Sequence, residues 1–338
     1  MALKKCIGRV GRVLCLETLP SQRQAEDAVF IPPGIHNEWG LFEPSGRCVP
    51  ESMTYHGVGR LHTASSALSL SAEVEAPVCS ADFEYLYIGP IEANHSYFFK
   101  RSLARFWAVP LIERRRLRLV FSTTDYEALQ RSVYFRGVCD ALNLGEENFL
   151  RVSAPLRFKR ILVPAPSFEE LSLIHRVHVD LMQMIGRRWM ARDNVSQPGR
   201  AIYLSKEKLP SGNVRIGNES EITDILSGKG VGIIYPETLS FRERVEFWAS
   251  NPLVVGFNTS FMFYSAMFPE RNILKISYGD DMWTNQCLID QANNNVSDYL
   301  CPENGCEARG AGDGFNMNFI VKDPRAVAES LLDAIASR

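Results

Sequence analysis

The chain has 338 residues, of which 46% are hydrophobic and 22% charged, and its formal net charge at pH 7 is −2. This balance is typical of a globular protein and does not indicate a nucleic-acid partner. The length is sufficient for two domains with separate cores. No run reaches the roughly eighteen uncharged apolar residues of a membrane span. Arg9 and Arg12 interrupt the start before a signal-peptide core, so we expect a cytoplasmic protein.

The N-terminal half is predicted to change character near residue 80. Residues 1–80 hold short apolar runs separated by proline and glycine, which favour a turn-rich β segment. Residues 81–165 predict an α/β pattern with strands at 85–88, 117–121 and 149–152 and helices at 95–107 and 126–142. Pro164-Ala165-Pro166 breaks the chain, and we place a domain boundary there, with the second domain at 166–338.

The C-terminal half repeats a strand, a turn and a helix. Apolar side chains recur at helical spacing from Phe168 to Trp189. Predicted strands then follow at 201–204, 231–235, 253–257 and 273–276, and predicted helices at 218–226, 240–248 and 261–268. A long polar loop comes next, and Asp323-Pro324 opens a terminal helix, for which one placement is back against the N-terminal domain. Such repeats predict an α/β fold with a parallel sheet covered by helices.

In open parallel sheets, ligands bind beyond the carboxyl ends of the strands. Lys206 ends one predicted strand, Arg215 lies in the Gly/Pro loop after it, Glu237 follows the next strand, and Asn258 to Ser260 follow the third. Cations and free amides suit a diphosphate, and a carboxylate suits a ribose. The pattern therefore predicts a site for an anionic, nucleotide-like ligand.

Each of these residues also has a simpler interpretation. Lys206 and Arg215 can be interpreted equally well as surface cations that contact no ligand. Glu237 can be interpreted as a carboxylate that complements a helix dipole. The segment from Asn258 to Ser260 could be a helix cap, as could Asn218 with its Glu three residues later. The apolar helix after Ser260 favours a ligand, since its first amides would otherwise be buried without acceptors.

At these positions the chain resembles glycosyltransferase family 61, which includes bacterial surface-polysaccharide transferases, plant xylan-decorating transferases and animal protein O-linked N-acetylglucosaminyltransferases. The matching segments are Arg200–Lys206, Arg215–Glu219, Pro236–Ser240 and Gly256–Ser260. A weaker match lies upstream at Asn94–Phe99 and Leu103–Phe106. Together they span roughly Tyr85 to Gly279. The chain departs from the family pattern in having Lys206 for an arginine and Asn258-Thr259 for His-Gly.

The resemblance implies a GT-B architecture, in which two Rossmann-like domains face each other across a cleft. It implies a nucleotide-sugar donor, a UDP-sugar in our interpretation, held by the C-terminal domain without a metal ion or other cofactor. The donor-binding residues would be Lys206, Arg215, Asn218, Glu219, Glu237, Asn258, Thr259 and Ser260. Arg105 matches an acceptor-side arginine, with a structural ion pair as the alternative.

His95 is the candidate catalytic base, because an imidazole at a loop-to-helix junction of the acceptor-side domain could take the proton of an acceptor hydroxyl. The alternatives are that His95 caps its helix or orients the two domains. Glu92 and Asp140 are fallback bases that are more simply read as solvated or capping carboxylates. His175 and His178 lie on the amphipathic helix and are expected to be packing or surface histidines.

The function predicted from these observations is transfer of a sugar, with inversion, to a glycan or lipid-linked acceptor in surface-polysaccharide synthesis. The basic run Arg114-Arg115-Arg116 with Arg118 is expected to be a solvated turn, with contact at the inner membrane surface as the alternative. The rival from another class is a non-catalytic relative that binds a nucleotide or glycan and organises an assembly complex. The departure at Asn258-Thr259 supports that rival. The sequence leaves the oligomeric state open.

Overall fold

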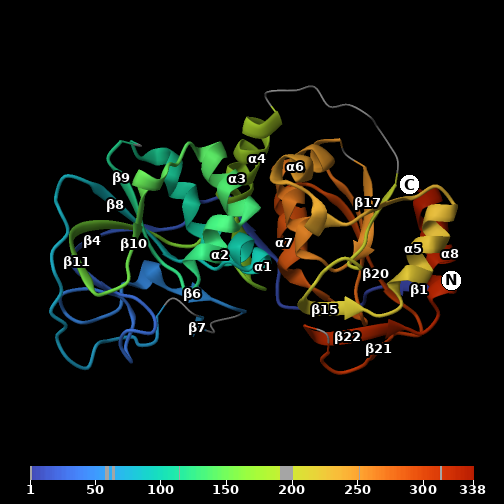
Figure 1. Ribbon diagram of the computed structural model, residues 1–338, viewed down its shortest axis with the longest axis horizontal. Coiled ribbons are helices and arrows are strands. Elements are labelled where there is room, and N and C mark those ends of the chain that lie inside the picture. The colour runs from blue at the N-terminus through green and yellow to red at the C-terminus, as the bar shows by residue number, and fades with distance from the viewer. Residues whose placement is uncertain are drawn as a thin grey trace. The chain divides into compact units, whose positions relative to one another are not determined.

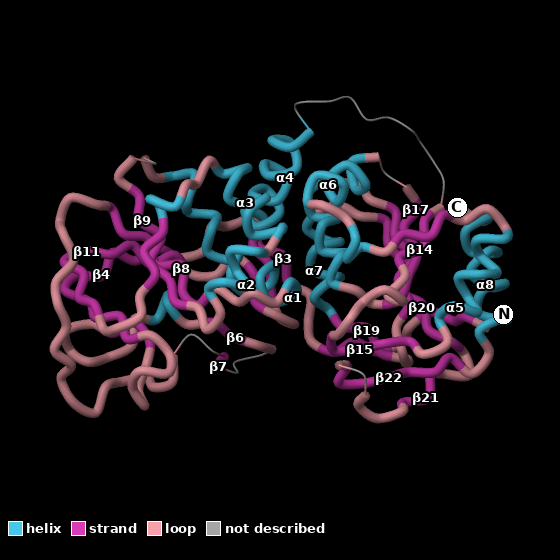
Figure 2. Tube along the Cα trace, viewed as in Figure 1, coloured by secondary structure: helices cyan, strands magenta, loops and turns pink. Residues whose placement is uncertain are grey.

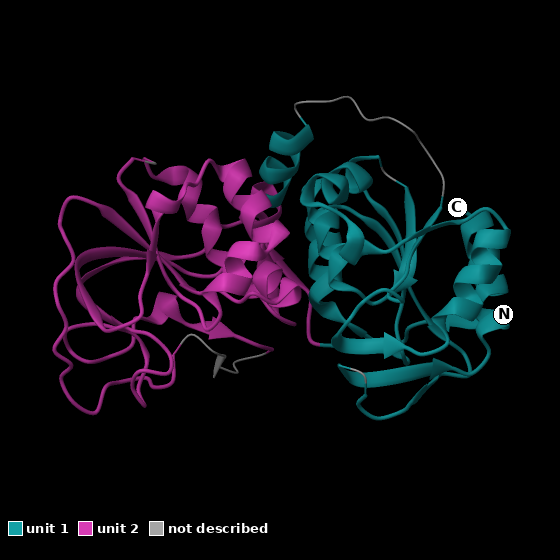
Figure 3. Cartoon of the chain, viewed as in Figure 1, with its two compact units in different colours: residues 1–10, 182–338 teal, residues 11–181 magenta. Residues whose placement is uncertain are grey.

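The computed structural model describes residues 2–57, 61–62, 65–113, 115–190, 201–250, 252–312 and 314–338 (Figures 1 and 2). Arg114 and Arg200, which belong to predicted features, lie outside the described residues. The chain forms two compact units (Figure 3). We refer to Gly11–Leu181 as the N-terminal unit, and to Met1–Val10 with Met182–Arg338 as the C-terminal unit.

The N-terminal unit is built on a six-stranded mixed sheet. Its strands, in spatial order, are β10 (Phe149–Arg151), β9 (Leu117–Ser122), β8 (Glu84–Pro90), β11 (Leu156–Pro164), β4 (Gln22–Ile31) and β5 (Gly40–Phe42). The first four are parallel to their neighbours, and β4 and β5 continue the sheet in antiparallel pairing. Smaller sheets join β12 (Phe168–Glu169), β13 (Leu173–His175) and β3 (Leu14–Leu16), and join β6 (Thr54–Tyr55) with β7 (Leu61–His62).

The helical part of the N-terminal unit is broken into short pieces. They are η1 (Pro50–Ser52), α1 (His95–Tyr97), η2 (Phe98–Ser102), η3 (Leu103–Leu111), α2 (Tyr126–Arg131), α3 (Val133–Leu142) and η4 (Glu146–Asn148). The predicted helix at 95–107 is thus a short α-helix followed by π and 3-10 turns. The predicted helix at 126–142 is interrupted at Ser132, because its side chain accepts the Phe135 N–H at 3.2 Å and starts a new helix.

The C-terminal unit contains the predicted parallel sheet. Its order is β1 (Leu3–Lys5), β20 (Val296–Pro302), β18 (Asn272–Ile276), β17 (Leu253–Phe257), β14 (Ile202–Leu204) and β16 (Gly232–Ile234). All pairs are parallel except β1 with β20. Figure 1 shows α6 (Phe241–Ala249) and α7 (Thr284–Ala292) on one side of this sheet, with α5 (Glu219–Gly228) and α8 (Pro324–Ala336) on the other.

Several further elements complete the C-terminal unit. A small sheet joins β15 (Gly212–Ile216), β22 (Phe315–Val321) and β21 (Cys306–Ala308), and β2 (Gly8–Val10) pairs with β19 (Asp281–Trp283). The 3-10 turns are η5 (Pro236–Thr238) and η6 (Ser260–Met267), and α4 (Arg176–Met190) begins in the N-terminal unit. The mixed α/β class and the parallel strands are as predicted, and the Ser240 capping box forms through Glu243 (3.3 and 2.7 Å).

Four sequence predictions were wrong in detail. The apolar segment 261–268 forms a 3-10 helix, Arg215 lies in strand β15 instead of a loop, and the helix predicted from Phe168 begins at Arg176 after two short strands. The long polar loop instead contains β19, α7 and β20. The last error has a clear cause: Asp290 accepts hydrogen bonds from Gln286 (2.7 Å), Asn295 (2.9 Å) and Tyr299 (2.5 Å), so polar side chains are buried there and hide the helical periodicity.

The units divide the chain differently from the predicted boundary after residue 165. Residues 166–181 belong to the N-terminal unit, where β13 pairs with β3. The first residues of the chain belong to the C-terminal unit, since β1 pairs with β20 and β2 with β19. Helix α8 lies in that same unit and packs against α5 and β1. No helix in the described ranges is long and apolar enough to cross a bilayer.

His178 is fully enclosed in the N-terminal unit. The Ser167 hydroxyl donates to the Ala104 carbonyl (2.8 Å), so it accepts from the Nδ1–H of His178 (3.0 Å), and the ring packs on Phe168. Burial lowers the pKa of His178 to about 3. The packing role expected for this histidine is therefore confirmed.

We predict that acid destabilises this unit through His178. Its folded-state pKa lies below the unfolded value near 6.5, so the unfolded chain binds the proton first and stability falls as the pH drops from 6.5 towards 3. At pH 5 the loss should be about 2 kcal/mol. Urea unfolding at pH 7 and pH 5 should show a smaller loss in His178→Asn, whereas His175→Asn should behave as wild type. An equal loss in all three proteins would contradict this role.

Candidate functional site

The carboxyl ends of four parallel strands bring five of the eight predicted donor residues, Lys206, Glu237 and Asn258 to Ser260, to one edge of the C-terminal sheet. Strand β14 pairs in parallel with β16 and β17, and β17 pairs in parallel with β18. The segments that leave this edge are Ser205-Lys206, Pro236-Glu237, Asn258 to Ser260 and Ser277-Tyr278. Ligands of open parallel sheets bind at such an edge. The edge is therefore the candidate site.

Lys206 is the central cation of this edge. Its side chain is only 8% exposed, and Nζ donates to the Tyr278 hydroxyl at 2.8 Å. The Tyr278 hydroxyl in turn donates to the Asn258 carbonyl at 3.3 Å. Burial lowers the pKa of Lys206, with a further lowering by Lys275, while Glu219 opposes the shift. A bound anion would relieve the cost of this buried charge, which makes Lys206 suited to a phosphate group.

A second buried lysine adds positive charge beneath the edge. Lys275 lies on β18, is 3% exposed, and has its Nζ 5.6 Å from the centre of the Tyr299 ring. Burial lowers its pKa to about 8, and Cys287 and Asp290 oppose the shift. Its proximity lowers the pKa of Lys206 as well. The two lysines together favour an anionic ligand at this edge.

Glu219 faces the protein interior and holds the turn that carries Lys206. The carboxylate is 1% exposed, and its two oxygens accept the Tyr203 hydroxyl (3.0 Å) and the Lys206 backbone N–H (2.9 Å). Burial raises the pKa of Glu219, and these hydrogen bonds oppose the shift. The geometry makes Glu219 a positioning residue for Lys206.

The segment after β17 is half-buried and turns into η6. The Asn258 N–H donates to the Ile276 carbonyl (2.9 Å), and Thr259 Oγ1 accepts the Phe261 N–H at 3.4 Å. Thr259 therefore acts as the cap that the alternative interpretation proposed. Gly256 lies just before this segment and favours close strand packing, since a Cβ there would lie 3.0 Å from the Leu204 carbonyl oxygen.

Glu237 lies in η5, directly after β16, and is half-buried. Its Oε1 atom is buried and has no hydrogen-bond partner among the described residues. Burial raises the pKa of Glu237, although Arg244 and Lys208 oppose the shift. A buried acceptor without a donor is costly, so this oxygen is available for a ligand hydroxyl.

The structure does not join Arg215 and Asn218 to the Lys206 cluster. Arg215 is opposite Asn318 in the β15–β22 pairing, and so lies on the face opposite Ile216, which is buried in the core. The Asn218 side chain donates to the Val321 carbonyl (2.9 Å) and accepts the Val321 N–H (3.0 Å). The predicted Asn218 cap of α5 is therefore not formed, because its amide binds β22 instead.

In the N-terminal unit, His95 is the first residue of α1 and is half-buried. The cap of this helix is Asn94, whose side chain accepts the Tyr97 N–H at 3.2 Å, so the capping alternative for His95 was wrong. The imidazole lies 5.0 Å from the Phe99 ring and 4.9 Å from the Tyr134 ring, measured between ring centres. The aromatic contacts hold the imidazole in place.

Arg105 is 1% exposed and binds mainly backbone oxygens, with no ion-pair partner among the described residues. Its guanidinium donates to Pro164 (3.1 Å), Ser52 (2.8 Å) and Met53 (2.9 Å) carbonyls and to Thr54 Oγ1 (3.2 Å). Arg105 thus ties the η1 segment to the end of β11. The geometry favours a structural role, although not through the ion pair that the sequence suggested.

The fallback bases have ordinary surroundings. Glu92 forms a salt bridge with Arg101 (3.1 Å), and Asp140 is exposed on α3. Sequence reasoning missed Tyr278 and Tyr203, which bind Lys206 and Glu219. The available signal for Tyr278 was its position two residues after an apolar strand, at the edge already assigned to the ligand. No cluster of three or more His, Cys, Asp or Glu side chains suited to a metal occurs within the described parts of the chain.

A mixed α/β protein with a buried cation at the carboxyl edge of a parallel sheet has the features of an enzyme that handles anionic substrates. The sequence model of the family Glycosyltransferase 61 matches residues 82–274, which is more than half of the chain, and the chain belongs to this family. Membership implies glycosyltransferase activity, and hence sugar donor and acceptor substrates. A search of curated proteins found no match.

We predict that Gly256→Ala destabilises the C-terminal unit by about 1–3 kcal/mol, because the new methyl group meets the Leu204 backbone and must push β14 and β17 apart. Urea unfolding should show the loss as a lower midpoint. Gly279→Ala is the matched control, since a Cβ at Gly279 has no atom within 4 Å. Equal stability of Gly256→Ala and wild type would show that the strands do not need this close approach.

Proposed function

We propose that this protein transfers a sugar from a UDP-sugar donor to a glycan or lipid-linked acceptor, with inversion and without a metal ion. The observation that carries the proposal is the buried Lys206 at the carboxyl edge, beside the half-buried turn from Asn258 to Ser260. A buried cation and a turn with small polar side chains suit a diphosphate.

The donor site is assigned as follows. Lys206 contacts the diphosphate. Tyr278 and Glu219 hold the lysine in position through hydrogen bonds. The half-buried turn from Asn258 to Ser260 lies near the same group, since Tyr278 binds both Lys206 and the Asn258 carbonyl. Glu237 accepts a hydroxyl of the ribose or the sugar through its unpartnered oxygen. Fixed positive charge of this kind stabilises the negative charge that develops on the leaving diphosphate, which lowers the barrier to transfer.

The transfer step is assigned to His95. Its imidazole takes the proton of an acceptor hydroxyl, and that oxygen then forms a bond to the anomeric carbon. The bond between this carbon and the diphosphate oxygen breaks, and the nucleoside diphosphate leaves with the bonding electrons. Attack from the side opposite the leaving group inverts the anomeric carbon. The step requires a GT-B arrangement in which the N-terminal unit binds the acceptor and the C-terminal unit binds the donor.

The cellular setting belongs to the same proposal. A lipid-linked acceptor would place the enzyme in the cytoplasm at the inner membrane surface, and surface-polysaccharide synthesis would be its pathway class. Of the basic run, Arg115, Arg116 and Arg118 are described; Arg115 and Arg116 are exposed, and the Arg118 guanidinium lies 3.8 Å from the centre of the Phe83 ring. The exposed side chains of Arg115 and Arg116 are the ones able to approach an anionic surface.

Replacement of the central cation should reduce turnover. We predict that Lys206→Met lowers kcat/KM for sugar transfer by about 10–100-fold, because one charge-assisted contact to the diphosphate is lost. Lys206→Arg, which restores the residue typical of the family, should keep most of the activity. The rate of product formation from UDP-sugars measures the change in kcat/KM. Calorimetric titration with UDP measures the loss of diphosphate binding.

Lys229→Met is the matched control, since Lys229 is exposed at the end of α5. Unchanged turnover and UDP affinity in Lys206→Met would contradict the assigned donor site. Tight UDP binding by wild type with no transfer to any acceptor would instead favour the non-catalytic relative that organises an assembly complex.

Loss of the base should affect chemistry and leave donor binding intact. We predict that His95→Gln lowers kcat by about 10²–10⁴-fold and leaves the UDP dissociation constant unchanged. His175→Gln controls for loss of a histidine in the same unit. If His95→Gln weakens UDP binding but retains wild-type kcat, the assignment of His95 as the base is wrong.

A further inference from the structure

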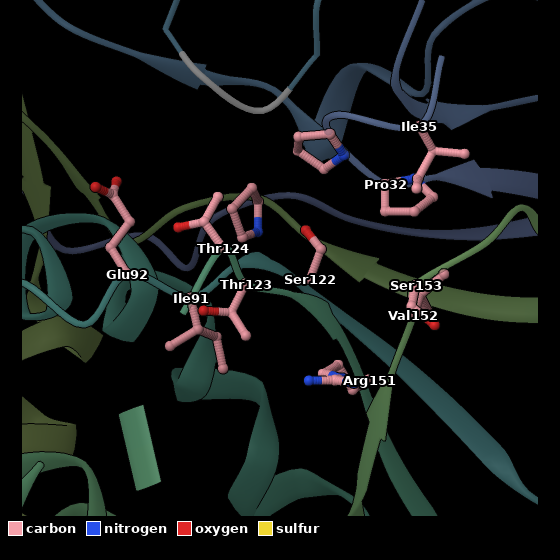
Figure 4. A pocket seen from close by; sticks show the side chains of 12 residues that line it. Pro32, Ile35, Ile91, Glu92, Ser122, Thr123, Thr124, Arg151, Val152 and Ser153 are labelled. Carbon is pink, nitrogen blue, oxygen red and sulfur yellow. The ribbon is translucent and has the colours of Figure 1, made fainter. Parts of the chain in front are cut away.

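The N-terminal unit has its own pocket, which the proposed donor and base do not use. It lies beyond the carboxyl ends of β8, β9 and β10 and has a volume of about 310 Å³. Figure 4 shows the side chains that surround it, and the turn after β4 closes the remaining side. We call it the β-edge pocket. Its volume is at the lower end of the roughly 300–1,000 Å³ of small-ligand sites, which suits a ligand of one ring.

Two buried hydroxyl groups at the end of β9 favour a polar ligand in this pocket. Ser122 Oγ and Thr123 Oγ1 are buried atoms with no hydrogen-bond partner among the described residues. Ser122 as a whole is only 4% exposed. Buried hydroxyls are nearly always hydrogen-bonded, because leaving one unpaired costs about 1–3 kcal/mol. A ligand with its own hydroxyls would supply the partners.

The other walls combine apolar surfaces with charge. Pro32, Ile91 and Val152 provide flat apolar contacts, and Ile91 and Val152 are held by backbone hydrogen bonds to Ser122 (2.8 Å) and Phe121 (2.8 Å). Apolar walls of this kind suit the C–H faces of a sugar ring, while the hydroxyls suit its edge. A purely apolar or purely ionic ligand would leave one set of walls without partners.

The charged side chains of the pocket are Arg151 and Glu92. The Arg151 guanidinium is exposed and lies 4.6 Å from the centre of the Tyr126 ring, which restricts its orientation. Glu92 is paired with Arg101, so its charge is already compensated. Arg151 has no ion-pair partner in the part of the chain that the structure describes, and its planar group can bind carboxylate or phosphate with two hydrogen bonds.

We propose that the β-edge pocket binds one sugar residue that carries a carboxylate or a phosphate group. Ser122 and Thr123 bind its hydroxyls, the apolar walls contact its ring, and Arg151 binds the acidic group. The proposal rests on the proposed function in one respect, since a glycosyltransferase handles sugars. The site itself is a binding site and needs no donor or turnover to be tested.

The test is calorimetric titration of the full chain with four probes: glucuronate, glucose 6-phosphate, glucose and inorganic phosphate. At least one acidic sugar should bind more tightly than both glucose and inorganic phosphate. Thr123→Val should weaken that binding about tenfold through loss of one hydrogen bond. Arg151→Gln should remove the preference for the acidic sugar over glucose. Glucuronate and glucose 6-phosphate separate the carboxylate from the phosphate.

A readout of stability separates binding from a structural role. Ser122→Ala should weaken binding of the acidic sugar. The Tm of the unliganded protein should stay unchanged or rise, because the removed hydroxyl has no hydrogen-bond partner among the described residues. The controls are Ser80→Ala and Arg136→Gln, whose exposed side chains lie outside the pocket. Both should bind the probes as wild type does.

Several results would overturn the proposal. The first is that neither acidic sugar binds. The second is that inorganic phosphate binds as tightly as glucose 6-phosphate while glucuronate does not bind. The third is that Thr123→Val and Arg151→Gln both bind the acidic sugar with unchanged affinity. Failure of the donor assignment gives a different result, because Lys206→Met should lose UDP binding but bind the acidic sugar as tightly as wild type. Likewise, Thr123→Val should keep UDP binding.

Discussion

The parallel pairing of β14 with β16 and β17 is the constraint on which the candidate site depends. It places the ends of three strands at one edge, although the residues concerned are far apart in the sequence. Gly256 favours the close pairing with β17, because a Cβ at this position would lie only 3.0 Å from the Leu204 carbonyl oxygen. Lys206 and Asn258 are then close enough for Tyr278 to bind both. Close strand packing thus brings together the residues to which the donor is assigned.

Burial of charge explains the behaviour of this edge. Lys206 and Lys275 lie almost out of contact with water, and each has a lowered pKa as a result. Glu219 is the carboxylate beside Lys206, yet its oxygens bind Tyr203 and the Lys206 backbone. Positive charge at the edge is therefore only partly compensated. A diphosphate would bring the missing negative charge, which is why the donor is assigned here despite the departure from the family pattern at Asn258-Thr259.

Sequence patterns predicted some elements well and others poorly, for physical reasons. Strand 253–257 is a continuous apolar run and strand 273–276 is apolar except for Lys275, because the parallel sheet buries both faces, so both strands were found. Helix α7 was missed because it buries the hydrogen-bonded Gln286 and Asp290 among its apolar residues, which hides the helical periodicity. Arg215 was assigned to the ligand edge from its position after a predicted strand. In the fold it lies in β15, which pairs with β22 from the far end of the chain. Such long-range pairing leaves no local signal.

The sequence by itself determined the α/β class, the family, and the carboxyl edge that carries Lys206, Glu237 and Asn258, since apolar runs and the residues that end them are local properties. The tertiary structure decided which side chains meet there. Tyr278 joined Lys206, Glu219 turned inward, and Asn218 bound Val321. It also decided that the first residues complete the C-terminal sheet and that Ser122 and Thr123 line a pocket. These outcomes depend on hydrogen bonds between distant segments, and such bonds form only once the chain is folded.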